Sequence, residues 1–227
     1  MSEKFAIRPI ARLYSDLPDK FGVPRQAGIV EALEGRIVFE PEYRNPEALR
    51  GIEGFSHLWL IWQFSRALRT EFSPTVRPPR LGGNERMGVF ATRSPFRPNS
   101  LGLSCVRLLR LETDAQLGTV LIVGGADLLD GTPIFDIKPY IPYADAHPEA
   151  RSGFAPDAGE RLTVEFPPAL EALVPPEKRA ALRGVLANDP RPRYQRDPER
   201  VYGLQFAGRN IKFTVAGDRL TVKEVES

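Results

Sequence analysis

The chain has 227 residues, of which 42% are hydrophobic and 26% are charged. This balance is typical of a globular protein and excludes an intrinsically disordered or collagen-like chain. A membrane-spanning helix needs about 20 consecutive apolar residues, whereas the best apolar run, residues 58–62, has five. The first ten residues contain no apolar signal core, so a cytoplasmic location is expected. With one cysteine, Cys105, and two histidines, neither an intrachain disulfide nor a zinc site of sulfur and imidazole ligands is expected.

The net charge of +2 conceals an uneven distribution. Residues 77–110 contain seven arginines and a single acid, Glu85. Such a basic segment in a nearly neutral protein favours an anionic partner, and a polyphosphate backbone is the obvious candidate. The alternative is a solvated arginine surface. Because the arginines lie among prolines and glycines instead of on a helix, anion binding is favoured.

Short apolar segments separated by turn residues dominate the first 145 residues. Many short strands with hardly any helical periodicity favour a closed antiparallel sheet, either a β-barrel or a sandwich, over an alternating α/β fold. A short helix is expected only at residues 45–51. The apolar, strand-like segments are residues 5–13, 27–38, 58–64, 86–92, 103–111 and 119–126.

The composition changes after residue 145, where a polar, Pro/Gly-rich stretch is typical of a linker. We therefore expect a barrel domain over residues 1–145, a linker over 146–160 and a small α+β domain over 161–227. The core of the small domain is thin, so it is expected to pack on the barrel or on a partner chain. Its expected elements are a strand at 162–166, a helix at 176–186 that begins with a proline, and strands at 202–206, 211–215 and 220–225.

The known fingerprints of phosphate-binding loops and of nucleophilic catalysis are missing from the sequence. No G-x-G-x-x-G or G-x-x-x-x-G-K-[ST] motif follows a strand and opens a helix, and there is no G-x-S-x-G elbow. A magnesium site built on Asp127, Asp130 and Asp136 is one alternative. Their apolar and Gly/Thr surroundings instead favour roles at strand ends and turns.

Three segments combine prolines and glycines with polar or charged side chains in ways that packing alone does not explain. Residues 77–104 carry arginines and asparagines on a backbone rich in prolines and glycines, and residues 24–28, PRQAG, add a loop arginine and amide. Residues 127–145 are expected to begin as a turn and to continue as a proline-interrupted edge strand. Loops of this kind usually serve ligand recognition.

The segments FGVPRQAG, GIEGFSHLWLIW, RPPRLGGNERMGVFATRSPFRPNSLGLS, DLLDGTPIFDIKPYIPYAD and DPRPRY closely resemble those of the TsaA-like, or TrmO, family of tRNA methyltransferases. The resemblance extends over essentially the whole chain, in the same order. It implies a non-Rossmann β-barrel enzyme that uses S-adenosyl-L-methionine to methylate N6 of threonylcarbamoyladenosine beside the tRNA anticodon. It also implies a homodimer with the cofactor near the subunit interface, and neither metal nor membrane as a partner.

The resemblance also assigns residues to the cofactor. Methyl transfer from a sulfonium requires in-line positioning but neither a metal nor a covalent enzyme intermediate. Arginines suit the cofactor carboxylate, Leu103 offers an apolar surface to the adenine, and turn backbone groups suit the adenine edge or ribose hydroxyls. A place in the core is the alternative for Leu103. The expected cofactor residues are Pro24, Arg25, Gln26, Ser65, Arg66, Arg93, Leu103, Asp130, Gly131, Thr132 and Pro133.

The RNA side of the site has two anionic targets, namely the threonyl carboxylate and the tRNA phosphates. In DPRPRY, which matches the family's DPRPxY pattern, Arg191 would hold a phosphate or carboxylate and Tyr194 would stack on an anticodon-loop base. The alternative is that residues 189–194 only end the helix and fold the small domain back. The expected RNA-side residues are Asn84, Arg86, Arg97, Asn99, Asp189, Arg191 and Tyr194. No general base stands out among Asp130, Lys138 and Tyr140.

Two further expectations concern partners. A barrel that binds RNA through residues 77–110 without catalysis is the alternative function. Residues 54–64, GFSHLWLIWQF, carry more apolar surface than one strand of a small barrel easily covers, which favours a barrel-to-barrel homodimer. An ordinary core strand is the alternative interpretation of this segment.

Overall fold

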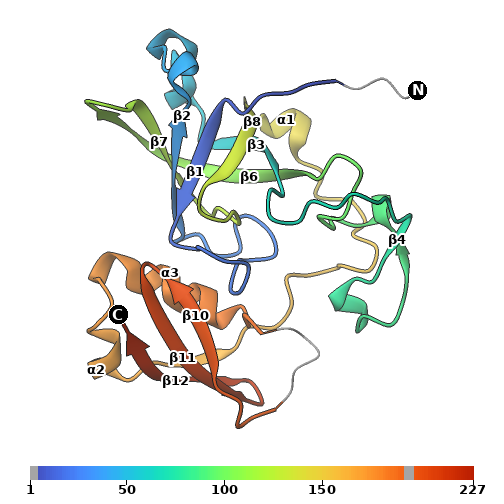
Figure 1. Cartoon of the computed structure of the whole chain (residues 1–227), viewed down its shortest axis with the longest axis vertical. Coiled ribbons are helices and arrows are strands. Elements are labelled where there is room, and N and C mark those ends of the chain that lie inside the picture. The colour runs from blue at the N-terminus through green and yellow to red at the C-terminus, as the bar shows by residue number, and fades with distance from the viewer. Residues whose placement is uncertain (1–4, 192–196) are drawn as a thin grey trace.

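The computed structural model describes residues 5–191 and 197–227, which fold mainly as β-strands (Figure 1). The strands are β1 (Ala11–Ser15), β2 (Glu34–Phe39), β3 (His57–Gln63), β4 (Thr75–Val76), β5 (Met87–Gly88), β6 (Leu101–Asp114), β7 (Gly118–Gly124), β8 (Thr132–Pro139), β9 (Thr163–Glu165), β10 (Tyr202–Phe206), β11 (Arg209–Ala216) and β12 (Arg219–Glu226). The helices are α1 (Pro142–Asp145), α2 (Pro168–Glu171) and α3 (Pro176–Ala187), with 3₁₀ turns η1 (Pro41–Tyr43), η2 (Pro46–Leu49), η3 (Ile52–Gly54), η4 (Pro79–Leu81) and η5 (Val89–Ala91). Among the described residues, no helix has the length and apolar character that a membrane span requires.

The first sheet is a closed barrel with the strand order β1-β2-β7-β6-β3-β8, in which every neighbouring pair is antiparallel. This confirms the expected mainly β fold with a barrel. The expectation of an edge strand within residues 127–145 is wrong, because β8 pairs with β1 on one side and with β3 on the other. Its prolines are tolerated because Pro133 and Pro139 lie at the two ends of the strand, where the loss of an N–H donor is least disruptive.

Alternate residues of the barrel strands point inward and form the core. On β3, Leu58, Leu60 and Trp62 are buried, and the outward-facing Trp59 donates its Nε1–H to Asp145 at 3.0 Å. Strand β3 is therefore an ordinary core strand whose aromatic residues are covered within the chain. Gly102 on β6 makes room for Trp62, since a Cβ there would lie 2.3 Å from the indole ring.

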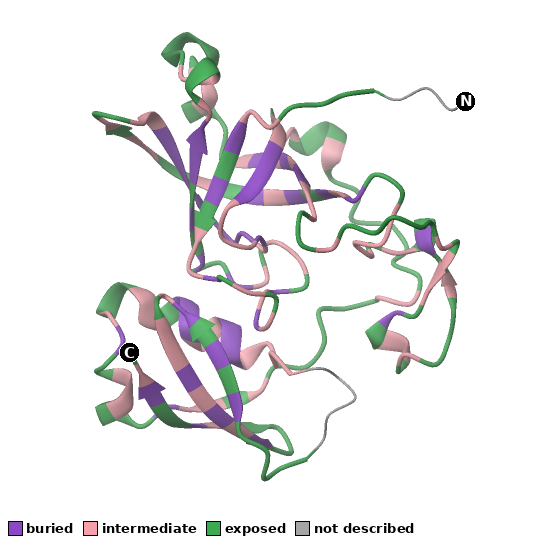
Figure 2. Cartoon of the chain, viewed as in Figure 1, coloured by how far each residue is buried: buried purple, intermediate pink, exposed green. Residues whose placement is uncertain are grey.

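Residues 64–100 leave the barrel as a long arm, which projects to the right in Figure 1 and carries the short β4–β5 hairpin. Figure 2 shows mostly exposed and intermediate residues on this arm. The expected strand at 86–92 is wrong: only β5 pairs with β4, and the 3₁₀ turn η5 follows. Pro74 and Pro78 flank β4 and keep it short, because proline has no N–H to donate to a partner strand. Residues 86–92 therefore have no long strand to pair with. The short helix expected at 45–51 is confirmed as η2, whose first turn is capped by the Asn45 side chain.

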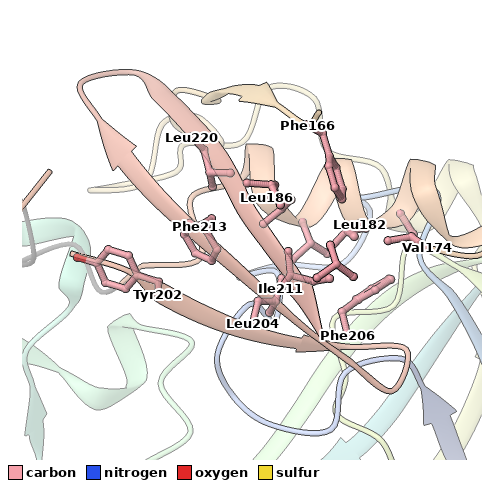
Figure 3. Packing of buried hydrophobic residues seen from close by; sticks show 14 of the residues in the cluster. Phe166, Val174, Leu182, Leu186, Tyr202, Leu204, Phe206, Ile211, Phe213 and Leu220 are labelled. Carbon is pink, nitrogen blue, oxygen red and sulfur yellow. The ribbon is translucent and has the colours of Figure 1, made fainter. Parts of the chain in front are cut away.

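The C-terminal residues form a second sheet with the order β10-β11-β12-β9, in which β9 runs parallel to β12. Helix α3 begins with Pro176, as expected, and packs its buried face on this sheet (Figure 3). The same core includes Leu17, Val30 and Leu33 from the connection between β1 and β2. Gly184 in α3 permits this contact, because a Cβ there would lie 2.5 Å from Val30 Cγ1. The C-terminal core thus packs on a connection of the barrel, as the sequence predicted. It is not thin, however, because in the part of the chain that the structure describes it contains 18 buried residues, compared with 13 in the barrel core.

Candidate active site

One end of the barrel gathers all the expected cofactor residues. Strands β1, β3 and β7 end there, and β2, β6 and β8 begin there. Residues 16–33, 64–100 and 125–131 therefore emerge side by side, on the end that packs on the C-terminal sheet. Each expected cofactor residue lies on one of these three connections or within the first three residues of β6 or β8. Lys138 and Tyr140, two of the three candidate bases, lie at the opposite end, where the Tyr140 N–H donates to the His57 carbonyl at 3.0 Å.

Residues 24–28 and the arm are joined through two of the expected cofactor residues. Arg93 Nη1 donates to Gln26 Oε1, although the two residues are 67 positions apart. Just beyond, the Gly28 N–H donates to the Gly125 carbonyl at 2.8 Å. Gly125 has a φ of +75°, and a Cβ on it would lie 3.1 Å from the backbone of Gly28. Glycine at this position therefore allows two of the connections to meet. The Arg25 and Arg93 side chains at this junction are exposed.

The turn at residues 130–133 is fixed on strand β1 and its extension. Asp130 Oδ1 accepts from the Ser15 N–H at 3.0 Å, and the Asp130 N–H donates to the Leu17 carbonyl at 2.9 Å. Gly131 adopts a φ of +75°, and its N–H donates to the Leu13 carbonyl at 2.9 Å. The backbone of this turn is therefore held rigidly enough to present defined polar groups to a ligand.

Ser65, Arg66 and Leu103 complete this end of the barrel. Arg66 Nη1 donates to the carbonyl of Pro18 and thereby ties the end of β3 to the β1–β2 connection. Leu103 faces outward between the buried Gly102 and Ser104, and it is 57% exposed. A core role for Leu103 is therefore excluded, and its side chain offers an apolar surface beside the polar groups.

Asp127 lies in the turn after β7, as the sequence predicted, but the sequence did not predict which groups it contacts. Its Oδ1 accepts from Ser104 Oγ at 2.6 Å, and Ser104 Oγ in turn accepts from Trp62 Nε1 at 2.9 Å. Burial raises the pKa of Asp127, while hydrogen bonds from Ser104 and from the Ala27 N–H and the charge of Arg93 act in the opposite direction. The signal available in the sequence was a polar Ser104 in an inward-facing position of an otherwise apolar strand.

The three aspartates considered as magnesium ligands have separate roles. Asp127 contacts Ser104 and Asp130 contacts Ser15, whereas Asp136 forms an ion pair with Lys138 at 3.1 Å. Within the described ranges, no group of three or more His, Cys, Asp or Glu side chains is placed to hold a metal ion.

The expected RNA-side residues of the arm lie on the connection between β3 and β6. Asn84, Arg86 and Asn99 are exposed, and Arg86 Nη1 lies 3.4 Å from Thr75 Oγ1 in the hairpin. Arg97 is turned back onto the arm, where its Nη1 donates to the Thr92 carbonyl at 2.9 Å. The arm thus presents some of its expected RNA-side groups outward and uses Arg97 to shape itself.

Comparisons with known proteins cover nearly the whole chain. Residues 12–146 match the family described as tRNA-methyltransferase O N-terminal domain, and residues 159–227 match the TrmO C-terminal domain. The tRNA (adenine(37)-N6)-methyltransferase of Escherichia coli (strain K12) is 41% identical over 220 residues, which make up 93% of each protein. The chain belongs to the TrmO family.

Two further relatives agree with membership of the TrmO family. A protein of Pseudomonas aeruginosa (strain PAO1), whose name describes an S-adenosylmethionine-dependent methyltransferase, is 41% identical over 209 residues and 88% of each chain. The crystal structure of TrmO from Pseudomonas aeruginosa superposes with a TM-score of 0.79 at 33% identity, covering 99% of this chain and 100% of that one. The family matches thus extend over both the barrel and the C-terminal sheet.

The DPRPRY segment of this TrmO-family chain begins directly after α3. Asp189 adopts a φ of +50°, and both of its carboxylate oxygens accept from the Arg191 guanidinium, at 2.8 and 3.0 Å. The Arg191 side chain is 11% exposed, and the hydrogen bonds that it donates to Asp189 raise its pKa. This contact agrees with the alternative in which the segment ends the helix, so an RNA contact of Arg191 stays a prediction. Tyr194 lies outside the described residues.

Proposed function

We propose that this TrmO-family chain uses S-adenosyl-L-methionine to methylate N6 of adenosine 37 in tRNA. The observation that carries the proposal is the match over 93% of the chain to a relative whose name states this activity. The gathering of the expected cofactor residues at one end of the barrel supports it. We further propose that the acceptor is threonylcarbamoyladenosine, because arginines beyond those expected for the cofactor are available for its threonyl carboxylate.

The side chains at the barrel end fit the chemistry of adenosylmethionine. Its carboxylate needs cationic donors, and Arg25 and Arg93 are exposed there. Its adenine needs an apolar surface, and Leu103 provides one. Its ribose hydroxyls need fixed polar partners, and the turn at 130–133 is held in place by the contacts of Asp130 and Gly131 with β1 and its extension.

Bound adenosylmethionine would supply a methyl group on a positively charged sulfur; the acceptor N6 would take the methyl group and lose its proton, and the neutral thioether would leave. The protein has to hold the cofactor and the acceptor nitrogen in line and keep water out, and such positioning removes a large part of the barrier. Arg93 and Gln26 lock two connections together for this purpose. Of the three candidate bases, Asp130 alone lies at this end of the barrel, and it accepts from the Ser15 N–H through one oxygen.

The arm offers a surface that suits single-stranded RNA. Phe72 and Phe90 stack on each other with ring centroids 6.5 Å apart, and they are 58% and 72% exposed. Exposed aromatic rings among arginines are typical of surfaces that stack on unpaired bases while holding the phosphates. We propose that residues 1–145 form the cofactor domain, that 146–160 form a linker, and that 161–227 form a second domain on the RNA side.

A cytoplasmic homodimer is the proposed active form. The covered strand β3 does not support it, but Leu103 is 57% exposed on the outer face of β6 and would be covered by a second chain. Light scattering on the cofactor-loaded protein tests the proposal. A particle of about twice the 25.3 kDa chain mass is expected, with activity that falls on dilution. A fully active particle of the single-chain mass would contradict it.

The activity is tested by methylating tRNA from cells that carry, or lack, the threonylcarbamoyl modification, in the presence of a chelator. Only the modified tRNA is expected to accept methyl, at position 37, and equal methylation of both would contradict the proposed acceptor. Adenosylmethionine at about 100 times its Kd should stabilise the folded protein by about 2.7 kcal/mol without added metal. The non-catalytic RNA-binding barrel predicts no such stabilisation.

A further inference from the structure

A chain of hydrogen bonds runs from the barrel core to the candidate cofactor site. Trp62 Nε1 donates to Ser104 Oγ at 2.9 Å, and Ser104 donates to Asp127 Oδ1 at 2.6 Å. Both Trp62 and Ser104 are buried, at 6% and 2% exposure. Because the indole N–H occupies the Ser104 oxygen as a donor, the Ser104 hydroxyl proton is directed toward Asp127.

The carboxylate of Asp127 also faces two connections that carry expected cofactor residues. The Ala27 backbone and the charge of Arg93 both lower the pKa of Asp127, which places both groups near its carboxylate. The Gly28 N–H donates to the Gly125 carbonyl at 2.8 Å and holds the two connections together two residues before Asp127. Arg93 also donates to Gln26, the residue before Ala27. The Asp127 carboxylate therefore bonds strand β6 and lies near both the β1–β2 connection and the arm.

The hydrogen-bond donors around this position suit a carboxyl group better than an amide of the same shape. A carboxylate accepts hydrogen bonds at both oxygens and donates none. An amide that accepted from Ser104 would direct its NH₂ group at the Ala27 N–H or at Arg93, which are themselves donors. The contacts therefore select for Asp over Asn, although burial makes the charge costly to keep.

We propose that Asp127 is a positioning residue, which holds residues 25–27 and Arg93 in the arrangement that binds the amino-acid end of adenosylmethionine. The inference rests on the proposed function, because it assigns the cofactor to this end of the barrel. Asp127 acts through Ala27, Gln26 and Arg93 and need not touch the cofactor. Ser104 and Trp62 anchor it to the barrel core.

The test is calorimetric titration of Asp127→Asn with adenosylmethionine in the absence of tRNA. The Kd is expected to rise about tenfold, the loss of one charge-assisted hydrogen bond, and kcat at saturating cofactor should stay close to that of the wild type. Hydrogen exchange at the Ala27 amide in the unliganded protein should accelerate. Asp136→Asn is the matched control, because Asp136 pairs with Lys138 on β8 and is expected to leave the Kd unchanged.

Ser104→Ala keeps the proposal testable if Asp127→Asn fails to fold. Removing one neutral donor should raise the Kd about threefold, while the unpaired Trp62 Nε1–H should lower the melting temperature without preventing folding. An unchanged Kd in a folded Asp127→Asn or Ser104→Ala protein overturns the inference but leaves the proposed function intact. An equal rise of the Kd in Asp136→Asn has the same consequence. A wild-type protein that does not bind adenosylmethionine overturns the proposed function itself.

Discussion

The barrel and the C-terminal sheet bury their apolar side chains in different ways. The barrel core comes mainly from the inward faces of its own strands. The core of the C-terminal sheet borrows Leu17, Val30 and Leu33 from the connection between β1 and β2. The sheet is therefore completed by the barrel, whereas the barrel interior needs nothing from the sheet.

Polar contacts also join the C-terminal region to the connection between β1 and β2. Lys178 Nζ contacts Asp16 Oδ2 at 2.6 Å, and the Ala207 N–H donates to the Asp16 carbonyl at 3.0 Å. The connection that makes these contacts, residues 16–33, also carries Arg25 and Gln26. One segment thus serves both the stability of the C-terminal sheet and the proposed cofactor site. Because different residues of the segment serve each role, mutations can separate the two roles.

The largest expected effect is on the shared core. Leu33→Ala should lower the free energy of unfolding by about 2–5 kcal/mol, because Leu33 is 2% exposed and its truncation leaves a cavity. Urea denaturation measures the loss, and hydrogen exchange should show it in β10 to β12. Leu173→Ala, at 47% exposure, is the control with little effect. Unchanged protection of β10 to β12 would show that the sheet does not depend on the barrel.

Arg25→Ala should weaken cofactor binding without lowering the stability of the folded protein. Adenosylmethionine binding is expected to weaken by about 1.5–3 kcal/mol through loss of a charge-assisted hydrogen bond, with urea stability close to that of the wild type. Calorimetric titration measures the change. Arg50→Ala is the matched control, since Arg50 is exposed on the β2–β3 connection at the opposite end of the barrel. Equal affinities of the Arg25 variant and the wild type would remove Arg25 from the cofactor site.

Arg191→Ala tests whether the C-terminal region meets RNA. The tRNA affinity is expected to fall and the slope of log K against log salt to drop by about one, as for the loss of one phosphate contact. Adenosylmethionine affinity should not change. Arg191 also holds Asp189 through two hydrogen bonds. If the variant instead loses hydrogen-exchange protection throughout β10 to β12, its role is structural.

The smallest expected effect is a pH dependence of opposite sign in the two regions. Burial raises the pKa of Asp127, so its contribution to stability is largest below the ordinary value of 3.8 and is lost as pH rises through the raised pKa. The hydrogen bonds from Arg183 lower the pKa of Glu171, so that contribution is present above 4.5 and is lost as pH falls. Because the Glu171 pair is partly exposed, its effect is about 1 kcal/mol or less.

Unfolding free energies of Asp127→Asn and Glu171→Gln, measured against the wild type across this pH range, check the signs. The wild type should lose stability relative to Asp127→Asn as pH rises, and relative to Glu171→Gln as pH falls. Parallel trends for the two variants would contradict the assignment of opposite shifts.

The amino-acid sequence determined the strands and the family. A continuous apolar run predicted β3 as a buried strand. Alternating apolar residues predicted β10 to β12, because a strand with one buried face repeats every two residues. The same local signal failed at residues 86–92, where the run has the composition of a strand but no long partner strand. Motifs, which are also local, placed the expected cofactor residues on loops.

Tertiary structure decided the contacts between distant segments. Barrel closure placed β8 between two strands instead of at an edge, turned Leu103 outward, and gathered three connections at one end. The decisive contacts join residues 23, 42 and 67 positions apart, namely Ser104 with Asp127, Trp62 with Ser104, and Gln26 with Arg93. Local periodicity shows which face of a strand is apolar, but which strand lies beside it depends on the register and closure of the whole sheet.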